Sequence, residues 1–153
     1  MERTLVILKP SCIQRELIGE VTKRFERKGL QLSGIKMMQL NDEILSEHYA
    51  HLKEKSFFQQ LKDRMMISPV IVCCWEGVDA VNVVRNMTGS TNCRNSASGT
   101  IRGDFGMSIQ ENIVHTSDSV ESAEIELKRF FKEDEIFNYR KSCFDFLYIS
   151  GEA

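Results

Sequence analysis

The feature that most constrains the fold is a pair of short apolar runs that lie far apart in the chain. The first, residues 4–8, is rich in β-branched side chains and stops at Lys9-Pro10, because proline cannot donate to a strand ladder. The second covers residues 69–75 and stops at Gly77. Short apolar runs bounded by turn residues are typical of strands that are buried on both faces. The sequence therefore predicts a sheet whose central strands are covered by other elements.

Apolar spacing elsewhere predicts the elements that surround these two strands. We expect helices over residues 14–28 with a stop at Gly29, from an N-cap at Asp42 to Leu52, over 56–65, over 78–85 and over 120–131, and strands over 31–40 and 113–115. Residues 88–106 are rich in Gly, Ser, Thr and Asn and predict a long loop, which in a compact domain usually serves function. If the two helices over 42–65 are an inserted hairpin, the order predicts an α+β fold. This would be a ferredoxin-like split βαβ sandwich, a four-stranded antiparallel sheet with helices on one face.

Length and charge limit the classes of protein that fit. A chain of 153 residues is expected to form a single domain, residues 1–153, with a C-terminal extension over about 133–153 that carries several aromatic residues. The net charge of −2 argues against a general nucleic-acid or anionic-membrane binder. No run approaches the length of a membrane span, and the five cysteines show no Cys-x-x-Cys spacing. These features predict a cytoplasmic protein without a disulfide framework, a membrane contact or a specific nucleic-acid partner.

A histidine stands where a short apolar segment meets a polar turn, in the run Asn-Ile-Val-His-Thr-Ser-Asp-Ser over residues 112–119. Glu126 follows at a spacing from which a helix can direct a carboxylate back toward His115. A histidine with an orienting carboxylate can act as a nucleophile or a base. Taken alone, this segment favours a histidine that merely helps to cap a helix, so the rest of the chain must decide.

Scattered cations and amides point to a second kind of chemistry. Lys9 ends a buried strand, and Arg85 and Arg102 flank the polar loop that holds Thr91. Asn112 and His115 are expected on the last strand. Each residue taken singly would be a solvated surface group. Together, a lysine and two arginine forks that converge near hydroxyl and amide groups would form a polyphosphate site.

These residues resemble one family, the nucleoside diphosphate kinases. The resemblance is carried by Lys-Pro at 9–10, Gly-Thr-Ile-Arg-Gly-Asp at 99–104, His-x-Ser-Asp at 115–118 and Ser-Ala-Glu at 122–124, and it is collinear from about residue 3 to 148. It implies an enzyme that passes the γ-phosphoryl group of a nucleoside triphosphate to a nucleoside diphosphate through a phosphohistidine. Mg²⁺ would be the metal cofactor, and a homo-hexamer the assembly.

The resemblance also implies a role for each residue. His115 would be the nucleophile, Glu126 braced by Ser117 would orient it, and Tyr49 would pack beside it and hydrogen-bond in the same cluster. The phosphates and ribose would be held by Lys9, Arg85, Thr91, Arg102 and Asn112. The base would stack between Phe57 and Ile109 with Leu61 close by, and Asp118 would be an outer-shell carboxylate for Mg²⁺.

The sequence departs from the family pattern at several positions. Thr116 replaces the usual glycine after the histidine, and Cys93 and Ser98 replace prolines of the long loop. These changes keep open a non-catalytic regulatory protein that retains the fold and pocket. A third alternative, an RNA-binding split βαβ domain, lacks the basic-aromatic strand signature of such domains. In all of the residues assigned to chemistry, the chain matches the family.

Overall fold

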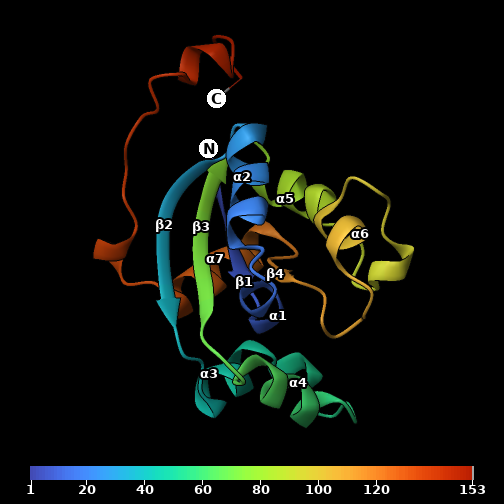
Figure 1. Cartoon of the computed structure of the whole chain (residues 1–153). Coiled ribbons are helices and arrows are strands. Elements are labelled where there is room, and N and C mark those ends of the chain that lie inside the picture. Colours follow the sequence, from blue (N-terminus) through green and yellow to red (C-terminus); the bar gives the residue numbers. More distant parts are fainter. Residues whose placement is uncertain (153) are drawn as a thin grey trace.

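The chain forms a four-stranded antiparallel sheet with helices on both of its faces, in a computed structural model that describes residues 1–152 (Figure 1). The strands lie in the order β2-β3-β1-β4. In chain order the helices and strands are β1 (Glu2–Leu8), α1 (Pro10–Gln14), α2 (Ile18–Lys28), β2 (Gln31–Met38), α3 (Asp42–His48), α4 (Phe58–Met65), β3 (Val70–Gly77), α5 (Ala80–Thr88), α6 (Ile101–Phe105), β4 (Val114–Thr116) and α7 (Val120–Phe130). Short 3-10 turns are η1 (Ala50–Leu52), η2 (Cys93–Asn95), η3 (Glu133–Glu135) and η4 (Phe144–Phe146). The predicted α+β split βαβ fold is confirmed.

The central strand β1 explains why its sequence is apolar at successive positions. Leu5 and Ile7 lie in one buried cluster, together with side chains of α3, α4 and α7. Val6 and Leu8 lie in a second cluster on the opposite face, together with side chains of α1, α2 and α5. Successive side chains of a strand point to opposite faces, so a strand covered on both sides must be apolar throughout. The expectation of helices on one face was therefore wrong.

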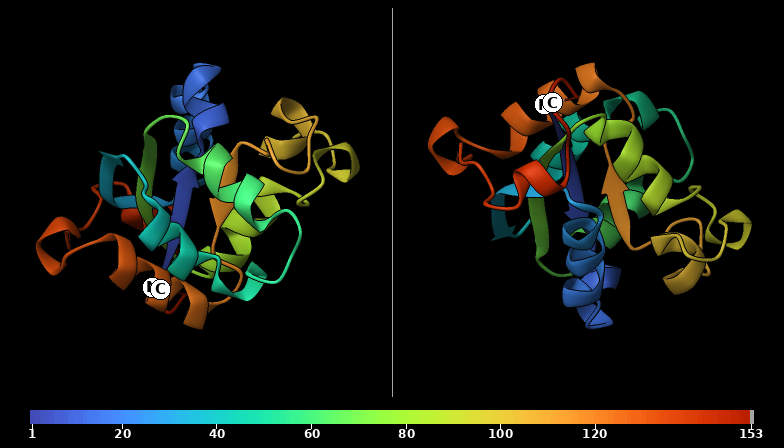
Figure 2. Two further views of the ribbon diagram at one scale, coloured as in Figure 1. Left: turned by 90° about the horizontal axis from the view of Figure 1, so that it is seen from below. Right: turned by 90° about the horizontal axis from the view of Figure 1, so that it is seen from above.

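The helical hairpin α3–α4 lies across one end of the sheet, as the view from below shows (Figure 2). Its N-cap is Asn41, whose Oδ1 accepts the N–H of Ile44 at 2.9 Å, rather than the predicted Asp42, which is the first helical residue. Both side chains are good caps, and the sequence offered no way to choose between neighbours. Residues of the hairpin and of β4 line the pocket that is described below.

Two other predicted segments differ in detail. The single helix expected over 14–28 is two helices, because Glu16 takes a left-handed backbone (φ 57°) between α1 and α2. Pro10 is the first residue of α1, a position at which its missing N–H costs nothing. The loop predicted over 88–106 contains η2 and α6, whose Ile101 is fully buried. A single apolar residue among polar neighbours gave too weak a signal for that helix.

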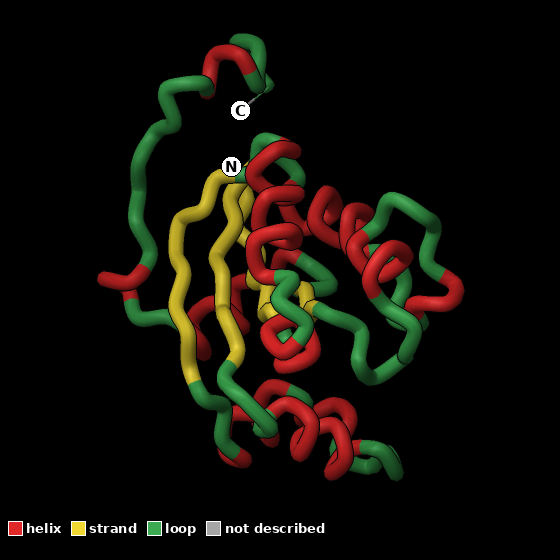
Figure 3. The backbone as a smooth tube through the Cα atoms, in the orientation of Figure 1, coloured by secondary structure: helices red, strands yellow, loops and turns green. Residues whose placement is uncertain are grey.

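The C-terminal extension runs along the outer edge of β2 as a mostly irregular segment (Figure 3). The Phe137 N–H donates to the Ser33 carbonyl at 2.8 Å, and the Tyr139 hydroxyl donates to the Leu32 carbonyl at 2.8 Å. The tail therefore satisfies part of the sheet edge that would otherwise be unpaired. No helix within residues 1–152 has both the length and the apolar character that a membrane span requires.

Candidate active site

An open pocket of about 1310 Å³ lies between the α3–α4 hairpin, the loop after α5, and the ends of β4 and α7. It is lined by nearly every residue that the sequence singled out: Lys9, Tyr49, Phe57, Leu61, Arg85, Thr91, Arg102, Ile109, Asn112, His115, Asp118 and Glu126. Ser117 is fully buried behind this lining. Segments that are distant in sequence thus converge on one site.

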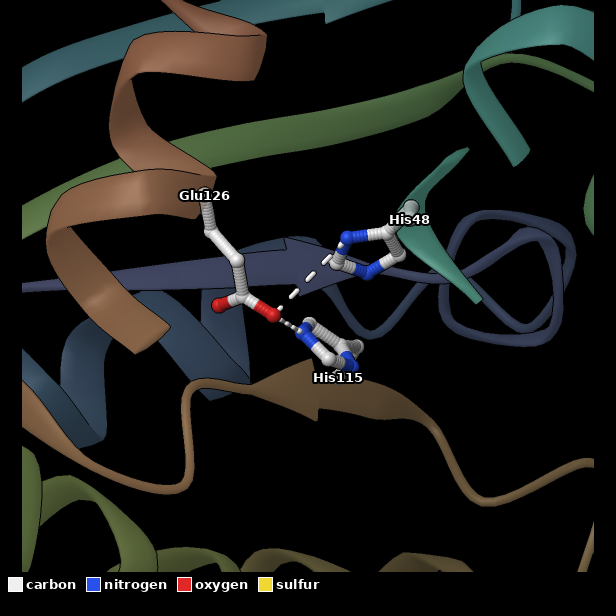
Figure 4. Close-up of side chains that lie close together, drawn as sticks. All are labelled: His48, His115 and Glu126. Atoms are coloured by element: carbon white, nitrogen blue, oxygen red, sulfur yellow. Dashed lines mark hydrogen bonds and ion pairs between the residues drawn. The ribbon is translucent and has the colours of Figure 1, made fainter. Parts of the chain in front are cut away.

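The centre of the pocket is a hydrogen-bonded chain from a strand to a helix. His115 lies in β4, opposite Ile7 of β1, and Glu126 projects from α7. His115 Nε2 lies 3.0 Å from Glu126 Oε1, and the Ser117 hydroxyl donates to Glu126 Oε2 at 2.5 Å. Ser117 Oγ in turn accepts the Leu5 N–H at 3.2 Å. The carboxylate is held at both oxygens, and the second nitrogen of His115 points away from it (Figure 4).

The electrostatics of Glu126 keep the carboxylate charged. Its burial works to raise the pKa, but the hydrogen bond and charge of His115 and the Ser117 hydroxyl outweigh burial and hold the pKa below its ordinary value. A charged acceptor at Nε2 favours the imidazole tautomer that carries its proton there. The Nδ1 atom then keeps a free lone pair.

Tyr49 packs beside this centre rather than joining its hydrogen bonds. Its ring is edge-on to that of His115 with centroids 5.9 Å apart, and the side chain is nearly fully buried. Burial raises the pKa of the Tyr49 hydroxyl, so it stays protonated. No hydrogen bond of the Tyr49 hydroxyl is found among residues 1–152, and its expected hydrogen bond in this cluster stays a prediction.

His48 is a member of the centre that the sequence did not reveal. Its ring packs edge-on against His115 with centroids 4.4 Å apart, and its Nδ1 lies 3.7 Å from Glu126 Oε1. Burial, followed by the charge of His115, lowers the pKa of His48 to about 3. His48 is therefore neutral at physiological pH, and its contact with Glu126 is not an ion pair. In the sequence, His48 occupies a position at helical spacing from the apolar residues of α3, which is the pattern of a core residue.

The backbone around His115 is tightly determined. Ile113 has φ 72°, a left-handed conformation that is costly for a β-branched residue, and its side chain is fully buried. Its carbonyl accepts the Lys9 N–H at 2.9 Å, which couples the two strand ends. Thr116 lies in β4 and pairs with Val6, in extended backbone that a β-branched side chain favours. Threonine in place of glycine therefore costs no strain here.

The cationic end of the pocket is organised by Lys9 and Asn112. Lys9 Nζ donates to Asn112 Oδ1 at 2.6 Å, and Asn112 Nδ2 donates to the Thr91 carbonyl at 3.1 Å. Burial, followed by the charge of Arg102, lowers the pKa of Lys9 to about 8. An ammonium group that is short of solvent gains strongly when a phosphate oxygen arrives.

Arg102 and Arg85 differ in how far their guanidinium groups are available to a ligand. Arg102 is buried, and its guanidinium donates to the carbonyls of Gly89, Asn112 and Val114 at 3.1, 3.2 and 2.8 Å. A guanidinium has five N–H donors, so part of the fork remains for a ligand, while the rest ties the loop to β4. Arg85 is exposed and lines the pocket. It offers a charge that is not committed to the fold.

The opposite end of the pocket is apolar and lies under the hairpin. Phe57 is 37% exposed and Ile109 is 48% exposed, whereas Leu61 is buried. An aromatic ring and an aliphatic side chain that both remain accessible can stack on a flat ring from two sides. No polar side chain is needed for such a contact, so it discriminates weakly between flat rings.

Asp118 is the carboxylate that suits a hard cation at the phosphate end. It lines the pocket, and a hydrogen bond from Ser122 followed by the charge of Arg85 lowers its pKa. Magnesium keeps several waters and is commonly bound through one or two carboxylates together with substrate phosphates. One ionised and exposed carboxylate fits that pattern. The whole arrangement suits phosphoryl transfer to the His115 imidazole.

The comparisons with known proteins agree with this chemistry. The sequence model of a family described as "Nucleoside diphosphate kinase" matches residues 2–136. The nucleoside diphosphate kinase of Parabacteroides distasonis is 68% identical over 99% of both chains. That of Bacillus cereus is 48% identical over 97% of this chain and 100% of its own.

Solved structures show the same fold. A halophilic nucleoside diphosphate kinase from Halobacterium salinarum in complex with CDP superposes with a TM-score of 0.94 at 39% identity, covering 96% of this chain and 98% of that one. A nucleoside diphosphate kinase family protein from Babesia bovis gives a TM-score of 0.93 at 41% identity, covering 97% and 100% of the two chains. The similarity therefore extends over nearly the whole chain.

Proposed function

The chain belongs to the nucleoside diphosphate kinase family and is an enzyme of that class, and from this premise we propose that it works by a ping-pong mechanism through a phosphohistidine on His115. The γ-phosphoryl group of a nucleoside triphosphate passes to His115 in the first half-reaction. It passes to the bound nucleoside diphosphate in the second half-reaction.

The observation that carries this proposal is the position of His115 Nε2, 3.0 Å from the charged Glu126. Nε2 keeps its proton, and Nδ1 presents a lone pair on the other side of the ring (Figure 4). In the first step a bond forms between Nδ1 and the γ-phosphorus, while the bond from that phosphorus to the β,γ-bridging oxygen breaks. The nucleoside diphosphate leaves with the electron pair. Glu126 stabilises the positive charge that develops on the ring.

The cations of the pocket supply the electrostatic part of the catalysis. Phosphoryl transfer depends mainly on in-line positioning and on neutralising charge on the transferred oxygens. Lys9, which is poorly solvated, would contact the transferred group and the ribose hydroxyl. Arg85, the free donors of Arg102 and the Thr91 hydroxyl would hold the remaining phosphates, and Asn112 would hold the ribose.

Mg²⁺ is the cofactor that these residues fit. The ion would be held by the nucleotide phosphates and water, with Asp118 as an outer-shell acceptor. When bound, it supplies charge neutralisation between the phosphates. The base would stack between Phe57 and Ile109, and the enzyme would accept nucleotides of several bases.

Initial-rate kinetics test this proposal. Varying a nucleoside triphosphate at several fixed concentrations of a nucleoside diphosphate should give parallel double-reciprocal lines, the signature of ping-pong transfer. His115→Ala should abolish transfer and still bind the nucleotide, as measured by calorimetry. Intersecting lines, or residual transfer by His115→Ala near the wild-type rate, would exclude the phosphohistidine route.

For the assembly we propose a homo-hexamer, and for the location the cytoplasm. Support for assembly comes from exposed apolar side chains on the edge strand β2, where Ile35 is 51% and Met37 is 59% exposed. Support for a reducing location comes from cysteines that are all free in residues 1–152. Light scattering tests the first, and a stable dimer or tetramer would refute it.

A further inference from the structure

The proposed transfer reaction gives no role to His48, the second imidazole beside the nucleophile His115. His48, His115 and Glu126 each offer one ligand atom, and these atoms all lie within 4.8 Å of one another (Figure 4). Glu126 Oε1 is the shared vertex, 3.0 Å from His115 Nε2 and 3.7 Å from His48 Nδ1. Two imidazoles and one carboxylate form a donor set that binds zinc in proteins.

The separations suit a small tetrahedral ion. With zinc–ligand bonds of about 2.0–2.1 Å, neighbouring ligand atoms of a tetrahedron lie about 3.4 Å apart. The two distances to Glu126 fall on either side of that value. The third pair of ligand atoms, on His48 and His115, lies within 4.8 Å, so a tetrahedral site requires this edge to shorten on binding. Water would supply the fourth ligand.

We propose that His48, His115 and Glu126 form an inhibitory site for Zn²⁺, separate from the Mg²⁺ that accompanies the nucleotide. Binding needs a lone pair on His115 Nε2, so the ring proton moves from Nε2 to Nδ1. The Nδ1 atom then has no lone pair with which to attack phosphorus. Inhibition follows from the tautomer itself, whether or not the metal obstructs the nucleotide.

The surroundings set the choice of metal. Magnesium prefers oxygen ligands and octahedral geometry, so a site with two nitrogen donors does not select it. His48 is neutral, and Glu126 provides the negative charge. The nearby cation is Arg129, whose guanidinium lies 3.4 Å from His48 Nδ1 and 2.8 Å from Glu47. The ion pair with Glu47 offsets its charge, and metal binding displaces only the long contact with His48.

Direct Zn²⁺ binding to the nucleotide-free protein tests the site without reference to activity. Competition with a chromogenic chelator should show one Zn²⁺ per chain for the wild type. His48→Gln should weaken binding at least tenfold. Two matched controls should bind as the wild type does: His51→Gln, which removes an exposed imidazole lining the same pocket, and Cys143→Ser, which removes the exposed thiol. Unchanged binding by His48→Gln, or loss of binding in either control, would refute the site.

A measurement on the unmodified protein covers the case in which His48→Gln does not fold. X-ray absorption at the zinc edge should show two imidazole nitrogens with oxygen ligands and no sulfur. Sulfur ligation, or a single imidazole, would contradict the proposal.

The claim that Zn²⁺ inhibits catalysis rests on the proposed phosphohistidine, and a separate experiment tests it. Protein phosphorylated beforehand with a nucleoside triphosphate should bind Zn²⁺ at least tenfold more weakly, because Nδ1 is occupied and Nε2 keeps its proton. Phosphorylated protein that binds as tightly as the free enzyme would contradict mutual exclusion. If no phosphate is incorporated while His48→Gln still loses zinc, the phosphohistidine mechanism fails and the metal site stands.

Discussion

Glu126 Oε1 lies 3.0 Å from His115 Nε2, while Glu126 Oε2 accepts the Ser117 hydroxyl at 2.5 Å. Both oxygens of one carboxylate are thus fixed, one by His115 and one by a buried serine that is hydrogen-bonded to β1. The orientation and the tautomer of His115 are therefore set by the fold before a nucleotide arrives. Such preorganisation is what phosphoryl transfer requires of a protein.

Glu126→Gln tests this relationship. The amide keeps an acceptor for the Nε2 proton but loses the charge that stabilises the ring as it becomes positive. We expect kcat to fall by roughly 100-fold, within the range for removing a positioned proton-handling group. Nucleotide affinity should stay within a factor of two in calorimetry. Ser117→Ala is the matched control and should lose less, because Glu126 retains His115; wild-type kcat in Glu126→Gln would contradict the role.

The lowered pKa of Lys9 predicts that nucleotide binding weakens at alkaline pH. Its pKa is about 8, below the ordinary 10.5, so the free enzyme loses this cation as the pH rises through about 8. We expect kcat/KM to fall by up to tenfold per pH unit above that point. The same limb should be absent in Lys9→Met, whose kcat/KM is low at every pH; a limb retained in that variant would assign the titration to another group.

The lowered pKa of Lys9 also affects stability, and in the opposite direction: nucleotide binding weakens as the pH rises, whereas the free energy of unfolding increases. A lysine whose folded pKa is lowered binds fewer protons in the folded state than in the unfolded state between pH 8 and 10.5. The contribution of Lys9 to the free energy of unfolding therefore rises with pH in that window. Urea unfolding of wild type and Lys9→Met at pH 7.5 and 9.5 measures it. The wild type should gain on the variant as the pH rises, and a constant difference would contradict the burial cost.

If Phe57 stacks on the base, loss of its ring should weaken the binding of every nucleotide, whichever base it carries. Phe57→Ala removes the stacking face, and base–aromatic stacking contributes about 1–3 kcal/mol. We expect KM to rise by roughly 5- to 150-fold for adenine, guanine and pyrimidine nucleotides alike, with kcat less affected. Phe137→Ala is the control, since that ring is 63% exposed and lies outside the pocket lining. A change confined to one base would mean that polar groups read the base.

The close packing around Gly103 predicts a steric limit in helix α6, which also carries Arg102. A Cβ at this position would lie 2.0 Å from the Ala97 carbonyl oxygen, which is backbone and cannot move aside cheaply. Gly103→Ala should destabilise the protein by about 1–3 kcal/mol, the usual cost of overpacking, and lower Tm by several degrees. Gly19→Ala in α2, where nothing lies within 4 Å, should be neutral or stabilising. Equal Tm values for the two variants would contradict the clash.

The parts of this fold that could be predicted are those with a strong local pattern. Two features could be predicted from the sequence: the apolar runs at β1 and β3, and the glycine that ends α2. Strand burial and left-handed caps each require particular residues. The choice of Asn41 over Asp42 as the N-cap and the short helix α6 could not be predicted. Each depends on tertiary contacts that neighbouring residues of similar propensity do not reveal.

The residues of the site also fall into those that could be predicted from the sequence and those that could not. The sequence motifs indicated the residues that line one pocket, and Lys9 and Arg102 were found as cations, one at the end of a buried strand and one beside a polar loop. His48 was missed because a histidine on the apolar face of a helix has the pattern of a core residue. Its proximity to His115 arises only when α3 is placed against β4 and α7.

Intact-mass analysis of the protein after incubation with ATP and Mg²⁺, followed by addition of a second nucleoside diphosphate, tests the central claim most directly. A mass gain of one phosphate should localise to His115 and should disappear when the diphosphate is added. Nucleotide binding without any gain in mass, or a phosphate that stays on the protein after the diphosphate is added, would contradict transfer through a phosphohistidine.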